Sequence, residues 1–369
     1  MPPDLRVLLL MSEVSANGGI QRFNRTLLGA CAELGVDCDV LALNDSSSVQ
    51  DSTPIGPTVR IRAFDRDKIR FSLTAAAAVN FGRYNVIVVG HINLLTLTAI
   101  SVAMKRRSRL RIFLIAHGVE VWTSIAGLRR RALAAVDTIL SVSGYTARTI
   151  QHQAPEIGDS RFAVFPNALG ETWTRKFSVL ENEQVELPER FILSVSRLDK
   201  AERYKGIVTT LEAFAMLDDP TLHYIIAGRG DDEEFLAGVA ARLQVSDRVH
   251  FVGGVSDAHL ARLYRECLVF VLPSGKEGFG IVFLEAMYFG APVIGAAAKG
   301  ALDVIRDEQT GLLVPYGDAR ALREALLRLL TDEELRQSLK IAGRQTVTGD
   351  GCFTFNAYVR RWAQVLRLP

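Results

Sequence analysis

Short apolar runs recur along the chain, and most are separated by stretches with helical spacing. Before residue 169, runs typical of buried strands occupy 6–11, 40–43, 86–89, 111–116, 138–142 and 163–165. After residue 190, further runs occupy 191–195, 223–227, 249–252, 269–272, 293–294 and 312–314. Amphipathic spacing predicts helices that include 20–34, 207–216, 232–243, 257–266, 281–289, 320–330 and 333–342. This alternation predicts α/β domains with parallel sheets covered on both faces.

The alternation is interrupted over residues 169–190, which are polar and acidic, show little periodicity and contain Pro188. We interpret this segment as a linker between a domain at 1–168 and a second domain at 191–352. A chain of 369 residues is long for one domain, which agrees with this division. The prediction is two doubly wound, Rossmann-like domains facing each other across a cleft, where ligands bind at strand ends.

A glycine-rich turn joins an apolar run to a helix in the second predicted domain. Gly275, Gly278 and Gly280 follow the run at 268–272, and helical spacing begins at Ile281. The first N–H groups of a helix lack partners and carry partial positive charge, so such a turn can hold an anion. Glycines also allow the backbone to approach a ligand closely. The sequence therefore predicts a phosphate site here.

Two carboxylates, Glu277 and Glu285, flank this turn. A carboxylate beside a phosphate costs about 1 kcal/mol at ~4 Å even in water, and more where water is excluded. Both side chains are therefore better explained as acceptors of hydroxyl hydrogen bonds than as phosphate ligands. The predicted ligand carries phosphates and sugar hydroxyls together.

Charge is unevenly distributed. Residues 1–168 hold 19 Lys+Arg against 13 Asp+Glu, whereas the remainder holds 24 against 28. Basic clusters at 105–111 and 129–131 are compatible with solvated helix ends or with a peripheral membrane contact. Aromatic residues do not interleave with these charges, so nucleic-acid binding is not expected.

Neither the cysteines nor the longest uncharged stretch indicates a special environment. The four cysteines show no metal-ligand spacing, which is typical of reduced thiols in the cytoplasm. Residues 86–104 contain no Asp, Glu, Lys or Arg, a length that could span a membrane. Gly90, His91 and Asn93 interrupt this stretch with turn-like residues, so we predict a strand followed by a helix and no transmembrane segment.

Several motifs occur in an order that resembles one known family. The second half contains SVSRLDKAERYKG (194–206), YIIAGRGDD (224–232), RVHFVGGVSD (248–257), EGFGIVFLE (277–285), GAPVIG (290–295) and TGLLVPYGD (310–318). The first half adds GGIQR (18–22), HGVE (117–120), VDTILSVSGYT (136–146) and VFPNALG (164–170). Together they resemble retaining glycosyltransferases of family 4, which have the GT-B fold. The resemblance covers most of the chain.

The resemblance implies roles for residues of the second domain that bind the donor. Glu285 would accept hydrogen bonds from the ribose, and Glu277 would meet the donor sugar. Arg197 and Lys205 match the two diphosphate-binding cations, although Lys200 and Arg203 lie in the same loop. Fixed cations stabilise the charge of a departing diphosphate. The remaining donor-binding residues implied by the motif are Gly278, Phe279, Gly280, Ile281 and Val282.

The first domain contributes candidates of its own. Gly18 and Gly19 precede the first predicted helix, so their amides can contact the diphosphate. His117 follows a strand and resembles the family's histidine beside the reacting sugar carbon. His91, at another strand end, is a candidate on the acceptor side. Two further acceptor-side candidates are Glu120 and Trp122.

The last stretch, 353–369, presents Phe355, Tyr358, Trp362 and Leu366 on one helical face, which must be buried. In the fold that this sequence resembles, the final helix crosses back onto the first domain. We expect the same crossing here.

The implied function is transfer of a sugar, with a hexose expected, from a UDP-sugar to a hydroxyl of a glycan or lipid-linked acceptor. The anomeric configuration is retained through front-side attack, in which the donor phosphate helps to deprotonate the acceptor hydroxyl. No metal or other cofactor is implied. The implied setting is bacterial-type polysaccharide or glycoconjugate synthesis in the cytoplasm. Location at the inner face of the membrane is an alternative.

Three other functions are compatible with parts of the sequence. A sugar-nucleotide epimerase of the same fold would turn over its substrate without an acceptor. A dinucleotide-dependent oxidoreductase is disfavoured because SEVSANGG follows the first strand in place of G-x-G-x-x-G. A protein that only binds sugar nucleotides is disfavoured by the joint presence of Glu277, Glu285, Arg197 and Lys205.

Overall fold

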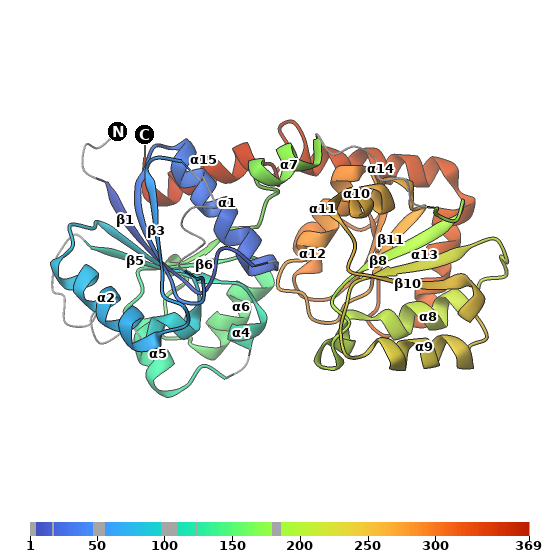
Figure 1. Ribbon diagram of the computed structural model, residues 1–369, viewed down its shortest axis with the longest axis horizontal. Helices are drawn as coiled ribbons and strands as arrows, with labels where there is room; N and C mark the ends of the chain where they lie inside the picture. The colour runs from blue at the N-terminus through green and yellow to red at the C-terminus, as the bar shows by residue number, and fades with distance from the viewer. Residues whose placement is uncertain are drawn as a thin grey trace. The chain divides into compact units, whose positions relative to one another are not determined.

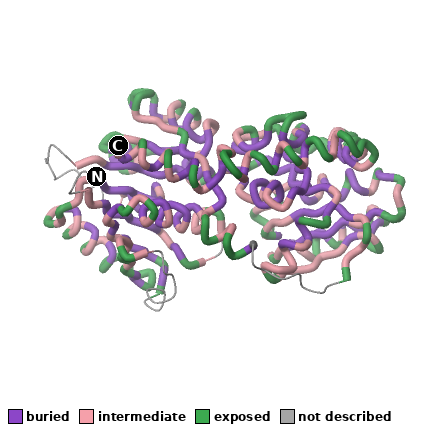
Figure 2. The backbone as a smooth tube through the Cα atoms, turned by 90° about the horizontal axis from the view of Figure 1, so that it is seen from above, coloured by how far each residue is buried: buried purple, intermediate pink, exposed green. Residues whose placement is uncertain are grey.

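The computed structural model describes residues 5–16, 18–46, 56–96, 110–122, 124–178 and 186–368. The chain divides into two compact units (Figure 1). The N-terminal unit comprises Met1–Thr172 together with Phe355–Pro369, and the C-terminal unit comprises Trp173–Thr354. Each unit has a buried interior formed by its own sheet (Figure 2).

The N-terminal unit is built on a seven-stranded parallel sheet in the order β3-β2-β1-β4-β5-β6-β7. The strands are β1 (Arg6–Met11), β2 (Asp37–Ala42), β3 (Val59–Ala63), β4 (Val86–Val89), β5 (Arg111–Ala116), β6 (Thr138–Ser141) and β7 (Phe162–Val164). Strand order reverses between β1 and β4, and sheets of this kind bind ligands outside the carboxyl ends at such a point.

Helices cover both faces of this sheet. They are α1 (Gly19–Glu33), α2 (Lys68–Phe81), α4 (Val119–Trp122), α5 (Gly127–Ala134), α6 (Gly144–Gln153), the 3₁₀ turn η2 (Asp159–Arg161) and α15 (Phe355–Leu366). Apolar side chains of α2, α4, α5 and α6 share one core cluster with β1, β4 and β5. On the other face, α1 packs against α15.

The C-terminal unit repeats the plan with a six-stranded parallel sheet in the order β10-β9-β8-β11-β12-β13. Its strands are β8 (Phe191–Val195), β9 (His223–Ala227), β10 (Val249–Gly253), β11 (Val269–Leu272), β12 (Val293–Ala296) and β13 (Leu312–Val314). Strand order reverses between β8 and β11, which are neighbours in the sheet. The loops after these two strands therefore meet at the same edge.

Helices and 3₁₀ turns of the C-terminal unit alternate with these strands. They are α7 (Glu171–Ser178), η3 (Lys200–Lys205), α8 (Ile207–Ala215), α9 (Glu233–Arg242), η4 (Ser246–Arg248), α10 (Asp257–Glu266), α11 (Ile281–Phe289), α12 (Ala301–Val304), α13 (Ala319–Thr331) and α14 (Glu333–Val347). Helix α8 packs against α9 and α13, whereas α11 packs against α10 and α14.

The predicted linker at 169–190 contains a helix, because Glu171–Ser178 form α7, and the division between the two units falls within it, after Thr172. Two aromatic side chains one turn apart explain this helix. Trp173 packs edge-on against Tyr288, with ring centroids 5.3 Å apart, and Phe177 packs against Phe289 at 5.5 Å. Residues 179–185 of the predicted linker lie outside the described residues.

Helix α15 is bound to the N-terminal unit through aromatic and polar contacts. Tyr358 and Trp362 are fully buried, and the Tyr358 ring centroid lies 4.6 Å from that of Phe165. The indole Nε1 of Trp362 donates to Cys31 Sγ at 3.2 Å. Burial of the amphipathic face, rather than helix propensity, therefore holds this segment in place.

Of the basic residues in the stretch at 105–111, the structure describes Arg111. Residues 105–109 lie outside the described residues. Arg111 begins β5, and its guanidinium donates to the Leu366 carbonyl at 2.9 Å and to the Val365 carbonyl at 3.4 Å. A cation at the last carbonyls of α15 satisfies groups that lack helical partners and complements the helix dipole.

We predict that Trp362→Ala lowers the free energy of unfolding by about 3–5 kcal/mol, since it leaves a cavity between α15 and the sheet. Phe81→Ala is the matched control, because the Phe81 side chain is 85% exposed. Urea titrations followed by circular dichroism measure both variants. Equal stability of Trp362→Ala and Phe81→Ala would contradict the described packing of α15.

Candidate functional site

The loops after β8 and β11 form one polar site at the carboxyl edge of the C-terminal sheet. The first loop runs from Ser196 through η3 to Gly206, and the second runs from Pro273 to Gly280. A backbone hydrogen bond from Gly275 N to the Tyr204 carbonyl, 2.8 Å long, joins the two loops. This junction fixes the side chains on either side of it.

An ion pair lies at the centre of the site. Lys205 Nζ donates to Glu277 Oε1 at 2.6 Å, and both side chains are largely buried. Burial alone lowers the pKa of Lys205, but the charge of Glu277 and its hydrogen bond outweigh burial and raise that pKa above the ordinary value. Lys205 is therefore a fixed cation over the whole physiological pH range.

The N-terminus of α11 opens beside this ion pair. Gly280, with φ of 94°, is the N-cap, and no side chain caps the first amides of the helix. The Phe279 ring is buried against Phe353, so this residue offers the site its backbone rather than its ring. Free amides and a nearby lysine make a site suited to phosphate oxygens. Ile281 and Val282, which follow, are half-buried.

Glu285 lies within α11 and is 3% exposed. The hydroxyl of Tyr264, on α10, donates to Glu285 Oε2 at 3.2 Å. A buried carboxylate costs much desolvation unless hydrogen bonds satisfy it, so Glu285 is set apart from ordinary charged residues on helix surfaces.

The other cations of the first loop have different partners. Arg197 is 72% exposed in its side chain and pairs with Glu202. Arg203 makes a bidentate pair with the buried Asp232, at 2.6 and 2.7 Å. Lys200 Nζ lies 4.0 Å from Asp231. Among these described cations, Lys205 contacts Glu277 and Arg197 is the most exposed to solvent.

Two glycines permit the close approach of the loops. A Cβ atom on Gly206, whose φ is 81°, would lie 2.4 Å from the Pro273 carbonyl oxygen. A Cβ atom on Gly300 would lie 2.3 Å from the Gly278 oxygen, and Gly300 N donates to the Glu277 carbonyl at 3.0 Å. Sequence reasoning identified neither this role of Gly300 nor the Asp232 clamp, because both depend on contacts between distant segments.

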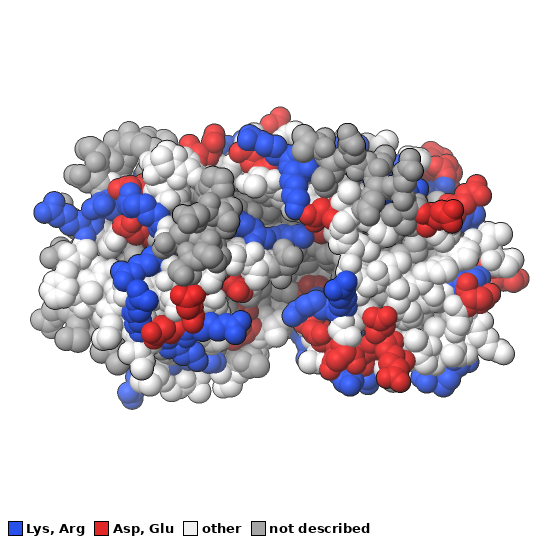
Figure 3. Space-filling model, viewed as in Figure 1, with Lys and Arg blue, Asp and Glu red and all other residues white. Residues whose placement is uncertain are grey.

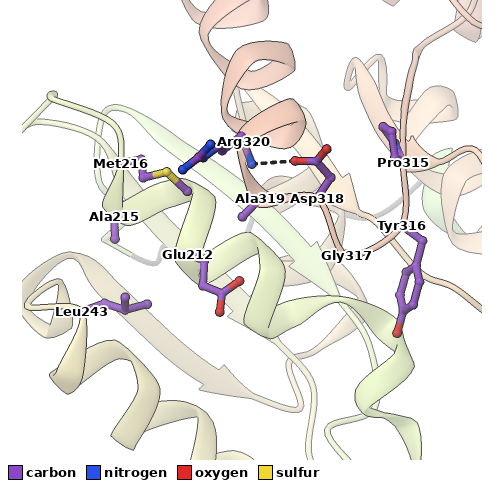
Figure 4. A pocket seen from close by; sticks show the side chains of 10 residues that line it. All are labelled: Glu212, Ala215, Met216, Leu243, Pro315, Tyr316, Gly317, Asp318, Ala319 and Arg320. Atoms are coloured by element: carbon purple, nitrogen blue, oxygen red, sulfur yellow. Dashed lines mark hydrogen bonds between the residues drawn. The ribbon is translucent and has the colours of Figure 1, made fainter.

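A separate open depression lies beside α8 (Figure 4). Its walls come from α8, the end of α9, the loop after β13 and the start of α13; they are Glu212, Ala215, Met216, Leu243, Pro315, Tyr316, Gly317, Asp318, Ala319 and Arg320. Asp318 caps α13 by accepting from Arg320 N at 3.0 Å, as the dashed line shows. A Cβ atom on Gly275 would lie 2.6 Å from the Tyr316 ring, so Tyr316 borders the candidate site.

A histidine pair marks the carboxyl edge of the N-terminal sheet. His117 follows β5, and its Nε2 donates to the Gly90 carbonyl, just after β4, at 2.9 Å. The His91 ring stacks near it, with centroids 6.4 Å apart. Glu120 accepts from His117 N at 2.6 Å and from Gly118 N at 3.2 Å. The structure thus brings His91, His117 and Glu120 together.

Trp122 ends α4, the helix that contains Glu120, and Gly18 and Gly19 lie at the start of α1. Trp122 Nε1 donates to Thr146 Oγ1 at 3.3 Å, and its ring packs edge-on against Tyr145. Gly19 begins α1, and Gly18 is its N-cap without a side-chain hydrogen bond. The described residues contain no cluster of three or more His, Cys, Asp or Glu side chains placed to hold a metal ion.

Two family models match consecutive parts of the chain. Glycosyltransferase Family 4 matches residues 17–169, and Glycosyl transferases group 1 matches residues 179–346. The phosphatidyl-myo-inositol mannosyltransferase of Mycobacterium leprae is 36% identical over 42% of this chain and 41% of its own length. The GDP-mannose-dependent alpha-(1-6)-phosphatidylinositol monomannoside mannosyltransferase of Mycobacterium tuberculosis is 29% identical over 64% of this chain and 65% of its own. This chain therefore spans less than two thirds of these relatives.

Solved structures agree in fold over nearly the whole chain. Anabaena Alr3699/HepE in complex with UDP matches with a TM-score of 0.77 at 17% identity, covering 98% of this chain and 100% of that one. Sucrose-phosphate synthase from Thermosynechococcus elongatus matches with a TM-score of 0.75 at 22% identity, covering 98% of each. The predicted two-domain α/β class is confirmed. In the described part of the chain, no helix combines the length and apolar character needed to cross a membrane.

We predict that stability falls as the pH drops below about 6.5, the ordinary histidine pKa. Burial lowers the pKa of His117 and of His91, while the charge of Glu120 opposes this. Below this pH the unfolded chain therefore binds more protons than the folded chain. The free energy of unfolding is highest above this pH and decreases as the pH falls below it.

Urea unfolding at pH 7.5 and pH 5.5 checks this prediction. A Trp173→Phe background leaves Trp122 and Trp362, both in the N-terminal unit, as fluorescent reporters. His117→Gln should reduce the difference between the two pH values. An unchanged difference would show that His117 does not cause the pH dependence.

Proposed function

We propose a sugar-transfer reaction for this chain, which belongs to glycosyltransferase family 4. The observation that carries the proposal is the Lys205–Glu277 pair beside the uncapped N-terminus of α11. The carboxyl edge of the C-terminal sheet thus presents positive charge that can bind a diphosphate, and a carboxylate that can accept hydrogen bonds from hydroxyl groups. A nucleotide sugar carries both kinds of group, and the GT-B fold provides the carboxyl-edge location for it.

The donor would be held by residues of the C-terminal unit. Arg197, Lys205 and the first amides of α11 would bind the diphosphate. Glu277 and the backbone of Gly278–Gly280 would meet the sugar hydroxyls. Glu285 would accept from the ribose hydroxyls in place of, or beside, its bond from Tyr264.

The proposed reaction breaks the bond between the anomeric carbon and the diphosphate oxygen. The acceptor hydroxyl oxygen forms the new bond on the same face, and its proton passes to a phosphate oxygen of the leaving group. Negative charge on the diphosphate grows in the transition state, so a fixed lysine accelerates this step without a metal ion. His117, with Gly18 and Gly19, is proposed to serve the reacting sugar and the diphosphate from the N-terminal unit.

The resemblance and the relatives support a finer proposal for the substrates. We propose a hexose as the sugar and UDP-sugar as the donor, with GDP-mannose as the second candidate because the Mycobacterium tuberculosis relative is named for it. The proposed acceptor is a hydroxyl of a glycan or lipid-linked sugar, lined by His91, Glu120 and Trp122. A reaction in bacterial-type glycoconjugate synthesis in the cytoplasm fits these substrates.

Incubation with UDP- and GDP-sugars in EDTA, followed by detection of released nucleotide, tests the reaction and its independence of metal. Conversion of one nucleotide sugar into another without acceptor or nucleotide release would instead indicate a sugar-nucleotide epimerase. Activity that requires added Mg²⁺ or Mn²⁺ would contradict the proposed role of the cations.

We predict that Lys205→Met lowers kcat by about 10²–10³-fold, the usual cost of removing one preorganised group that stabilises transition-state charge. The KM for the donor should change less, because the charge interaction strengthens as the bond breaks. Lys200→Met is the matched control, since its side chain is 63% exposed and lies at the edge of the same loop. A Lys205→Met enzyme with normal kcat and a raised KM would refute this electrostatic role.

A further inference from the structure

Two further lysines, Lys276 and Lys299, border the candidate site of the C-terminal unit. Lys276 immediately precedes Glu277 in the loop after β11, and Lys299 lies in the loop after β12, the neighbouring strand. Gly300 N donates to the Glu277 carbonyl at 3.0 Å. The two loops are therefore joined at the residues that directly follow the two lysines.

The charges of the two lysines act on each other at this junction. Lys276 is exposed and Lys299 is half-buried. Burial and the like charge of Lys276 both lower the pKa of Lys299. Lys276 Nζ lies 5.5 Å from the centre of the Tyr204 ring, and Lys205 Nζ lies 5.7 Å from the centre of the same ring. Several ammonium groups gathered in this way raise the affinity of a site for anions.

The backbone at Lys299 is in an unusual conformation. Its φ of 51° falls in the left-handed region, which residues with a Cβ atom rarely adopt. A glycine would adopt the same conformation without steric cost. Residues held in such conformations cluster at functional sites. The side chain at position 299 is therefore a candidate for a function that glycine could not supply.

Acidic side chains balance the cations of the first loop. Arg203 pairs with Asp232, and Arg197 pairs with Glu202. Figure 3 shows similar mixing on the visible face of the C-terminal unit, where Lys and Arg side chains lie next to a group of Asp and Glu side chains. At Lys276 and Lys299, by contrast, two like charges adjoin, and an anionic ligand would relieve their repulsion.

We propose that Lys276 and Lys299 bind a carboxylate on the transferred sugar, so that the donor is a nucleotide-linked hexuronic acid. Strand β12 lies on the other side of β11 from β8, so the loop of Lys299 is opposite the loop proposed to bind the diphosphate. Ammonium groups form strong charge-assisted hydrogen bonds with carboxylates. Both lysines belong to the unit proposed to bind the donor, which favours an acid on the sugar over an acid on the acceptor. This inference rests on the proposed function and refines its hexose to a hexuronic acid.

Isothermal titration calorimetry of the full chain tests this assignment without an acceptor. The ligands are UDP, UDP-glucose and UDP-glucuronic acid, and in parallel GDP, GDP-mannose and GDP-mannuronic acid. With the nucleotide that the protein binds, the acidic sugar should bind about tenfold more tightly than the neutral one, because hydrogen bonds between charged groups are stronger than neutral ones. This preference should weaken in about 0.5 M NaCl.

The Lys276→Gln/Lys299→Gly variant should bind the acidic and the neutral sugar nucleotide equally, and glycine is compatible with the backbone at position 299. Its affinity for the free nucleotide should be that of the unaltered protein. Lys200→Gln is the matched control, because this lysine is 63% exposed in its side chain and lies at the edge of the first loop. This control should keep the preference for the acid.

Two results would overturn the inference while leaving the proposed function in place. The first is equal affinity of the unaltered protein for the acidic and the neutral sugar nucleotide. The second is a double variant that loses affinity for the free nucleotide as much as for the acid, since the lysines would then serve the diphosphate. If none of the six ligands binds, the proposed function fails and this inference fails with it.

Discussion

The close approach of two loops at the carboxyl edge of the C-terminal sheet is the constraint on which the candidate site depends. Gly206 passes so near Pro273 that any side chain there would collide with its carbonyl. The Gly275–Tyr204 hydrogen bond then closes the junction. Only with the loops at this distance can Lys205 and Glu277 form a 2.6 Å ion pair. The buried ion pair therefore depends on a glycine at position 206.

The sheet explains why these particular loops meet. Strand order reverses between β8 and β11, so the crossovers from these strands lead to opposite sides and leave their loops side by side. In the N-terminal unit the strand order reverses in the same way between β1 and β4. His91 follows β4, and His117 follows the neighbouring strand β5. In each unit the candidate site residues therefore lie at the carboxyl edge of the sheet. Surface ion pairs hold the surrounding loops.

The sequence was sufficient for most strands because parallel strands buried on both faces form unbroken apolar runs, such as 6–11 and 269–272. It failed at β3, whose Val59–Ala63 alternates arginines with apolar residues at a sheet edge. It also failed at α7, because the partners of Trp173 and Phe177 lie more than 100 residues away. Local pattern carries no information on such contacts.

The candidate site was likewise predictable from the sequence only in part. Lys205 and Glu277 could be selected because each lies in a motif, and their mutual contact follows from strand order. The groups that hold the surrounding loops could not be selected. Tyr204, Asp232 and Gly300 act through backbone carbonyls, a buried carboxylate and a close contact, and none of these leaves a recognisable spacing.

Hydrogen–deuterium exchange of the full chain, with and without UDP or GDP, tests the central claim most directly. The amides of residues 196–206 and 273–285 report on the two loops and the first turn of α11. The account predicts that at least one nucleotide protects both segments, with weaker protection in Lys205→Met. Protection confined to other segments at saturating nucleotide, or none with either nucleotide, would contradict a nucleotide-sugar site at this edge of the sheet.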